Sequence, residues 1–314
     1  MSSRRLPVFF ALLATIAVSA CSSDDSASPA TDAPTTLSPV TEAPTTETVD
    51  PAVEAMMYTE AGPYPVGVTT LELAAGNKVE VWYPAVEGTT GAEFYDTRDF
   101  VPPAIKALLT ADVPARYDYT AGRDAVVADG QFPIVLFSHG YSGIRYQSTF
   151  LTAHLASWGM VVAAPDHWSR DLYHVLSAPV GDRESATGEL LGTLDLVISG
   201  NDDPASLFQG HVDVSRVIAL GHSAGGGTIV SAAKDDRIDG YISMASGVLG
   251  MGGSDATTIA PPTFVNKPSF FIAGALDAII SAEESTRPSF EAVPGPSRLW
   301  IIDGVGHNGF DDFC

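Results

Sequence analysis

Short apolar runs alternate with longer segments of mixed polarity from about Pro63 to the end of the chain. The runs are rich in β-branched residues and apolar at consecutive positions, which is typical of strands buried on both faces of a parallel sheet. The expected strands are residues 133–137, 160–164, 214–220, 238–245, 268–274 and 298–302, and the clearest expected helices are residues 145–158, 184–198 and 226–233. This alternation predicts an α/β fold with a mostly parallel sheet and helices on both of its faces.

Two features precede this alternation. Residues 66–73 and 79–84 predict an antiparallel pair of strands around a Gly-Asn turn. Residues 85–131 then lead to the first parallel strand, with a short helical candidate at 103–109. A connection of this length is usually functional, so we expect it to form part of the rim of a substrate cleft. Its aromatic residues either line that cleft or only pack the segment onto the domain; they are Phe94, Tyr95, Phe100, Tyr117 and Tyr119.

The clearest chemical motif is Gly221-His222-Ser223-Ala224-Gly225, which reads G-x-S-x-G. It stands between an expected strand and a segment of small residues that suits a closely packed helix. In that setting a serine sits at the apex of a strained turn and its hydroxyl is presented to substrate. In any other setting the motif would be an ordinary Gly-rich turn. The sequence therefore predicts that Ser223 is a catalytic nucleophile.

A second loop, residues 138–143, follows the strand at 133–137 and contains two glycines. In hydrolases built on such a sheet, this loop supplies one backbone N–H to the oxyanion and the residue after the nucleophile supplies the other. We therefore predict an oxyanion hole made by the N–H groups of Tyr141 and Ala224.

An acid and a base follow the serine at the ends of later strands. Asp277 comes after residues 268–274, and His307 comes after residues 298–302. The C-terminal ends of parallel strands are where ligand sites form in open α/β sheets, and the order Ser, Asp, His is the order of the α/β-hydrolases. The sequence thus predicts a Ser223–His307–Asp277 triad. Two other carboxylates are alternatives for its acid, namely Asp303 and Asp255.

With these motifs in place, the chain resembles secreted bacterial α/β-hydrolases. The likeness is carried by residues 138–141, 150–159 and 161–167 and by the Gly-His-Ser of the nucleophile motif, and it extends over residues 60–314. The chain is similar to platelet-activating-factor acetylhydrolase-like and dienelactone-hydrolase-like esterases, and it shares motifs with cutinases and polyester hydrolases. The resemblance implies an eight-stranded sheet and ester hydrolysis through an acyl-enzyme without a cofactor.

Two departures from the polyester hydrolases bear on the substrate. Those enzymes carry Met after the nucleophile and Trp on the loop after the sixth strand, where this chain has Ala224 and the Gly-rich residues 246–253. The resemblance therefore implies short- to medium-chain esters, with polyester hydrolysis as the alternative. Because a fold does not fix a function, peptidase or C–C hydrolase activity and a non-catalytic surface-binding lipoprotein are further alternatives.

The first 20 residues predict an export signal. Arg4 and Arg5 precede an apolar stretch over residues 8–18, which is too short to span a bilayer and suits a signal peptide. The end of this stretch resembles a bacterial lipobox, so Cys21 is expected to become the lipidated first residue; a plain secretory signal is the alternative. The mature protein would then be exported and held at the outer face of the cell membrane, or be extracellular.

Composition divides the remainder of the chain. Residues 21–55 are rich in Ser, Thr, Pro and acidic residues and predict a disordered linker, which leaves residues 56–314 as the hydrolase domain. The net charge of −22 argues against nucleic acid and against direct contact with anionic lipid. We expect a monomer that acts on a small ester or lipid-like substrate, with the membrane reached only through the anchor.

Two further expectations concern metal ions and the C-terminus. Asp166, His167, Asp171 and His174 cluster after one strand, but their spacing matches no standard zinc site, so we expect no metal. Related hydrolases continue past the histidine with at least one helix. We therefore expect a further C-terminal element, which would contain the partner of Cys314.

Overall fold

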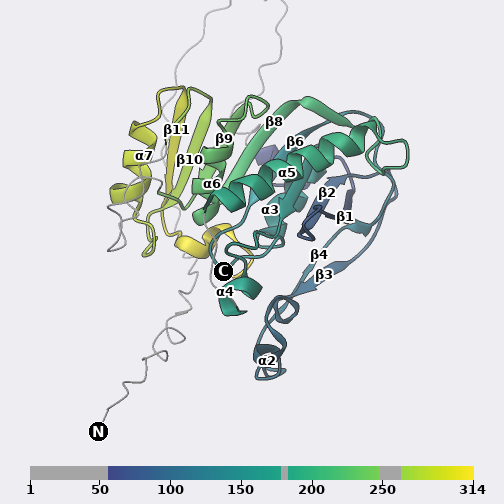
Figure 1. The fold of residues 1–314 in the computed structure, drawn as a ribbon, viewed down its shortest axis with the longest axis horizontal. Helices are drawn as coiled ribbons and strands as arrows, with labels where there is room; N and C mark the ends of the chain where they lie inside the picture. The colour runs from purple at the N-terminus through teal and green to yellow at the C-terminus, as the bar shows by residue number, and fades with distance from the viewer. Residues whose placement is uncertain (1–55, 178–182, 248–262) are drawn as a thin grey trace, which may run out of the picture.

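Nine strands pair into one sheet in the described part of the chain, which covers residues 56–177, 183–247 and 263–314 of a computed structural model (Figure 1). Their order is β11-β10-β9-β8-β6-β7-β2-β1-β5. The strands from β7 through β6 to β11 run parallel, whereas β2 is antiparallel to both β7 and β1. The strands are β1 (Val66–Glu72), β2 (Lys78–Pro84), β5 (Gly122–Arg123), β6 (Phe132–Ser138), β7 (Val161–Pro165), β8 (Val212–His222), β9 (Gly240–Met244), β10 (Ser269–Gly274) and β11 (Ser297–Ile302). The predicted α/β architecture is confirmed.

Both faces of the sheet are buried because successive residues of a strand point to opposite sides. In β6, Ile134 and Leu136 pack into one core, which also holds the apolar side chains of α5 (Arg183–Asp202) and α6 (Ala224–Ala232). Val135 and Phe137 pack into a second core on the opposite face, with α3 (Thr149–Ser157). The continuous apolar run that predicted this strand is thus a consequence of its burial on both sides.

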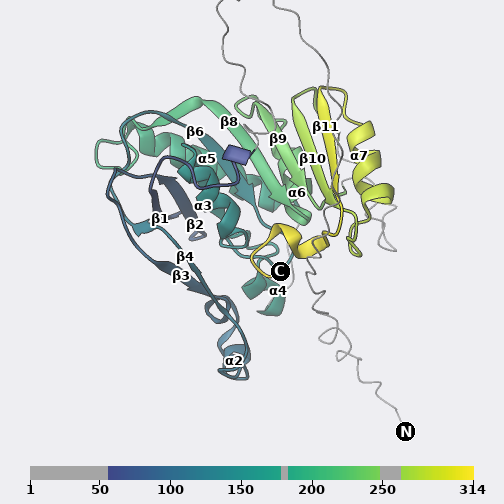
Figure 2. The ribbon, with the colours of Figure 1, turned by 180° about the vertical axis from the view of Figure 1, so that it is seen from behind.

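The segment before β6 forms a hairpin of its own. Strands β3 (Glu93–Asp96) and β4 (Arg116–Tyr119) pair with each other, and their connection carries η1 (Thr97–Phe100) and α2 (Pro103–Lys106). Figures 1 and 2 show this hairpin extending away from the sheet, with α2 at its far end.

The aromatic residues of this segment divide between the two roles considered for them. Tyr95 is buried and stacks between Tyr117 and Tyr146, at centroid distances of 5.0 and 5.1 Å. Phe100 lines a cavity. Some aromatic residues of this segment, such as Tyr95, therefore pack it onto the domain, whereas others, such as Phe100, face a cavity.

Two predicted features differ from the structure. The sheet has nine strands in its described part instead of eight, because Gly122–Arg123 pairs with β1 and Arg123 makes ion pairs with Glu80 and Glu93. The helix expected over residues 145–158 begins only at Thr149. The residues before it form tertiary hydrogen bonds instead, including one from the Arg145 N–H to Asp166.

The C-terminal segment packs back onto the domain. After η3 (His307–Phe310), the Asp312 carboxylate accepts hydrogen bonds from the N–H and hydroxyl of Thr149 and from the Tyr95 hydroxyl. The expectation that a further C-terminal element contains the partner of Cys314 is not tested by the described residues. Cys21 and the predicted signal peptide and linker lie outside them. No helix in the described ranges is both long enough and apolar enough to cross a bilayer.

Candidate active site

Ser223 occupies a tight turn between β8 and α6, as the motif predicted. Its backbone has φ 54° and ψ −121°, a strained conformation for a residue with a side chain. The flanking glycines allow the close approach that the turn requires. A Cβ on Gly221 would lie 2.4 Å from the Gly225 carbonyl oxygen, and one on Gly225 would lie 1.9 Å from the Ser138 carbonyl oxygen. The turn therefore holds the Ser223 hydroxyl above the ends of the central strands.

The structure brings together Ser223, His307 and Asp277 from three separate strand ends. The His307 Nε2 lies 3.0 Å from the Ser223 Oγ, and the His307 Nδ1 lies 2.7 Å from the Asp277 Oδ2. The three side chains form one continuous chain of hydrogen bonds, in the order required for a serine nucleophile, a general base and an orienting carboxylate.

The environment of Asp277 keeps its carboxylate ionised. Burial raises the pKa of Asp277, but hydrogen bonds from His307 and from the N–H groups of Ile279 and Ile280 lower it by more, so the net shift is downward. Both of those N–H groups donate to Oδ1, which leaves Oδ2 for His307. The carboxylate is thus fixed in one orientation.

The alternative acids do not occupy this position. Asp303 is exposed at the end of β11 and makes no hydrogen bond to His307 among the described residues. Asp255 lies outside the described residues. Asp277 is therefore the carboxylate that contacts His307.

The residues that carry the two predicted oxyanion donors lie close to the Ser223 turn. Ala224 begins α6 directly after the serine. A Cβ on Gly140, the residue before Tyr141, would lie 3.2 Å from the Ser223 Cβ. Within the described residues, neither the Tyr141 nor the Ala224 N–H donates a hydrogen bond to a protein acceptor. Both donors remain available to an oxygen that approaches the serine.

A buried layer of polar side chains supports the oxyanion loop from behind. The Arg170 guanidinium donates to the His139 carbonyl, to the Ser138 hydroxyl and to the Thr228 hydroxyl. The His167 N–H donates to the His139 Nε2. Burial lowers the pKa of His139 to about 3, so this ring is neutral and does not repel Arg170.

Glu189 also belongs to this buried layer, and its raised pKa makes the free energy of unfolding depend on pH. It accepts hydrogen bonds from Asn77, His167 and Trp168, and burial raises its pKa from 4.5 to about 7. A folded-state pKa above the unfolded value contributes stability below the unfolded pKa, and this stability is lost as the pH rises through the folded pKa. We expect the unfolding free energy to fall by about 2 kcal/mol per such group between pH 4.5 and 8.

Glu189→Gln removes this titrating group, so the unfolding free energy of the wild type relative to that of Glu189→Gln, measured by urea unfolding at several pH values, should fall between pH 4.5 and 8. A pH dependence that is unchanged in Glu189→Gln would contradict the assignment to Glu189.

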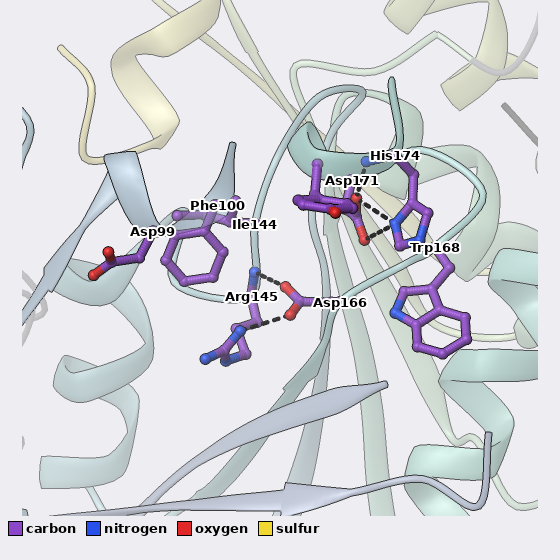
Figure 3. A pocket seen from close by; sticks show the side chains of 9 residues that line it. Asp99, Phe100, Ile144, Arg145, Asp166, Trp168, Asp171 and His174 are labelled. Atoms are coloured by element: carbon purple, nitrogen blue, oxygen red, sulfur yellow. Dashed lines mark hydrogen bonds and ion pairs between the residues drawn. The ribbon is translucent and has the colours of Figure 1, made fainter. Parts of the chain in front are cut away.

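In the cluster considered as a metal site, the side chains of Asp166, Asp171 and His174 form ion pairs or hydrogen bonds with neighbouring side chains. Figure 3 shows Arg145 paired with Asp166, and Asp171 with His174. These four side chains line a cavity of about 350 Å³. His167 is turned away into the buried layer, where it meets Ser138 and Glu189. Among the described residues, no group of three or more His, Cys, Asp or Glu side chains is arranged to hold a metal ion.

Sequence reasoning missed two residues of the site, Gln147 and His222. Gln147 follows the oxyanion loop and His222 precedes the nucleophile, and their side chains meet in the protein interior. The motif contained His222 only as a variable position. Nothing in the spacing of the two residues indicated that they touch.

Comparison with known proteins identifies similar chains. The family model described as PETase, PET hydrolase-like, matches residues 125–311. Cutinase est2 of Thermobifida alba is 25% identical over 176 residues, which is 55% of this chain and 52% of that protein. Cutinase cut1 of Thermobifida fusca is 26% identical over 176 residues, or 55% and 49%. The platelet-activating factor acetylhydrolase of Cavia porcellus is 24% identical over 309 residues, or 80% and 68%. The chain spans about half the length of the cutinases it matches.

Proposed function

The chain belongs to the PET hydrolase-like family and has the α/β-hydrolase fold, and from that premise we propose that it is a serine hydrolase of carboxylic esters. The observation that carries the proposal is the hydrogen-bonded series from Ser223 through His307 to Asp277. The names of its relatives, cutinases and an acetylhydrolase, support the same reaction class.

In the proposed reaction, His307 Nε2 takes the hydroxyl proton as the Ser223 Oγ attacks the ester carbonyl carbon. The carbonyl oxygen becomes an oxyanion between the N–H groups of Tyr141 and Ala224, where two oriented donors stabilise it. His307 then gives the proton to the leaving alcohol, and an acyl group remains on Ser223. Water activated by His307 attacks this acyl-enzyme and releases the acid, while Asp277 stabilises the imidazolium in both steps.

We propose short- to medium-chain esters as substrates. Apolar side chains stand exposed beside the candidate triad: Tyr141 is 59% exposed, Leu276 67% and Ile279 69%. Tyr141 belongs to the oxyanion loop, and Leu276 and Ile279 lie on the two sides of Asp277 in the sequence. We therefore expect an acyl chain bound at Ser223 to contact these side chains. Polyester hydrolysis is the second candidate, favoured by the family match.

A fluorophosphonate probe tests the reaction class directly. It should label the wild-type protein once, and peptide mapping should place the label on Ser223. The labelled protein should lose its turnover of p-nitrophenyl butyrate. Absence of labelling in folded protein would instead favour a non-catalytic binding role, and labelling at another serine would reject the assigned nucleophile.

A panel of substrates separates the candidate activities. We expect the highest kcat/KM on p-nitrophenyl esters of short to medium acyl length, with little activity on amides. A peak on long-chain triglycerides would contradict the proposal, and faster release of monomers from a polyester film would favour the second candidate.

We also propose that the mature protein is anchored through a lipid on Cys21, a residue chosen for its lipobox-like setting in the sequence. Two or more acyl chains hold a protein firmly on a bilayer, whereas one binds only marginally. Cys21→Ser is expected to move the protein from the membrane fraction to the medium, or to stall its processing. Fully processed Cys21→Ser protein that stays in the membrane fraction would contradict the anchor.

Thiol chemistry gives an independent check on the anchor. The chain has two cysteines, and a sulfur that carries a lipid cannot also form a disulfide. Mass spectrometry of the mature N-terminal peptide should show acyl groups. A disulfide between the two cysteines in membrane-derived protein would reject lipidation of the Cys21 sulfur.

A further inference from the structure

Gln147 is buried behind the oxyanion loop and makes two side-chain hydrogen bonds. Its Oε1 lies 2.8 Å from the backbone N of Gly140, and its Nε2 contacts the Nδ1 of His222. Gly140 precedes Tyr141, and His222 precedes Ser223. One side chain therefore joins the two loops that meet at the candidate oxyanion hole.

The partners of Gln147 determine the direction of every bond. A backbone N–H can only donate, so the atom that faces Gly140 is the amide oxygen and the atom that faces His222 is the NH2 group. An NH2 group only donates, so the His222 Nδ1 is the acceptor and carries no proton. Burial and the nearby His307 lower the pKa of His222 to about 3, so this ring is neutral and its proton is on Nε2.

The His222 Nε2–H donates a hydrogen bond to the backbone of His307. This nitrogen lies 3.0 Å from the carbonyl oxygen of His307, which can only accept. The resulting series runs from the Gly140 N–H through Gln147 and His222 to the backbone of His307. It links the oxyanion loop, the nucleophile turn and the segment that carries the general base, which come from three distant parts of the chain.

We infer that Gln147 is a positioning residue of the esterase: by fixing the His222 tautomer it holds the oxyanion loop and the backbone of His307 in register with Ser223. This inference rests on the proposed function. Productive geometry at such a site has to be held to within roughly 0.5 Å, which requires a support whose own orientation is fixed. Gln147 meets that requirement because both ends of its amide are hydrogen-bonded and its backbone carbonyl accepts from the Asp312 N–H.

Replacement of Gln147 by methionine, which has a similar length but no amide, tests the kinetic consequence. Gln147→Met is expected to lower kcat for p-nitrophenyl butyrate about 10- to 100-fold, since a misplacement of about 1 Å can cost that much. KM should stay within about twofold, because substrate contacts are retained. Assays run well below the melting temperature of each variant separate this effect from a loss of stability.

Thr152→Val is the matched control. Thr152 is buried on α3, five positions after Gln147, and its hydroxyl has no hydrogen-bond partner among the described residues. Removing that hydroxyl should leave kcat unchanged. Unchanged kcat in Gln147→Met as well would overturn the inference.

The tautomer of His222 provides a readout that needs no turnover. In protein labelled with ¹⁵N at the histidine rings, the wild-type His222 Nδ1 should be unprotonated. Gln147→Glu should place a proton on it, because a carboxylate in this position accepts from both neighbours. A protonated Nδ1 in the wild-type protein, or no change in Gln147→Glu, would overturn the inference.

Failure of the proposed function and failure of the positioning role would give different results. A wild-type protein with neither turnover nor probe labelling would contradict the proposed function, and the positioning role of Gln147 with it. An active wild-type protein together with an equally active Gln147→Met variant would contradict the positioning role alone.

Discussion

Ser223→Ala is expected to lower kcat for p-nitrophenyl butyrate by about 10⁴-fold or more, because the loss of the nucleophile in comparable triads costs up to about 10⁶-fold. Among the described residues, no hydroxyl other than that of Ser223 is hydrogen-bonded to the His307 Nε2, so no second nucleophile can replace Ser223. The backbone strain at this residue, with φ 54°, is the same for alanine as for serine. The variant should therefore fold, with a melting temperature equal to or slightly above that of the wild type.

Steady-state kinetics and circular dichroism together check this expectation. Ser231→Ala is the matched control, since Ser231 lies on α6 and, among the described residues, its hydroxyl donates only to the Gly227 carbonyl. That variant should keep wild-type kcat. A well-folded Ser223→Ala protein with retained turnover would show that Ser223 is not the nucleophile.

The central fold was predictable because its signals are local. Strands β6, β7 and β8 are apolar over consecutive positions, and this pattern follows from burial between two helical layers. The turn at Ser223 was predictable for a related reason. Its glycines are required by backbone contacts within one strand–turn–helix unit, so the motif itself contains the constraint.

The edge of the fold was not predictable, because it depends on contacts between distant residues. Strand β5 has two residues, too few to produce any alternation, and Arg123 ties it to Glu80 and Glu93. Strands β3 and β4 have four residues each and are separated by a long connection. Their pairing is supported by the stacking of Tyr95 on Tyr117, which no short-range pattern indicates.

The same distinction applies to the site. The three members of the candidate triad were predictable one by one, because each follows an apolar strand at the same edge of a parallel sheet. The support behind them was not. The amide of Gln147 meets His222 across 75 positions of sequence, and the Arg170 guanidinium reaches Thr228 across 58. Such contacts depend on the assembled fold, and composition at either end does not reveal them.

Asp277→Asn is expected to lower kcat for the same ester by about 10⁴-fold, with little change in stability. The N–H groups of Ile279 and Ile280 hold the oxygen that they contact, so the new NH2 group would have to replace Oδ2. That group donates to the His307 Nδ1 instead of accepting from it. The proton of His307 would then move to Nε2, and this nitrogen could no longer take the proton of Ser223.

Asp303→Asn supplies the comparison, because Asp303 is an exposed carboxylate four positions before the same histidine. It should keep kcat within about twofold, as surface substitutions away from a site usually do. The ratio of the two kcat values, measured at one pH with equal amounts of probe-reactive enzyme, decides between the acids. An active Asp277→Asn beside an inactive Asp303→Asn would reverse the assignment. Equal losses in both would indicate that the two carboxylates share the work of orienting His307.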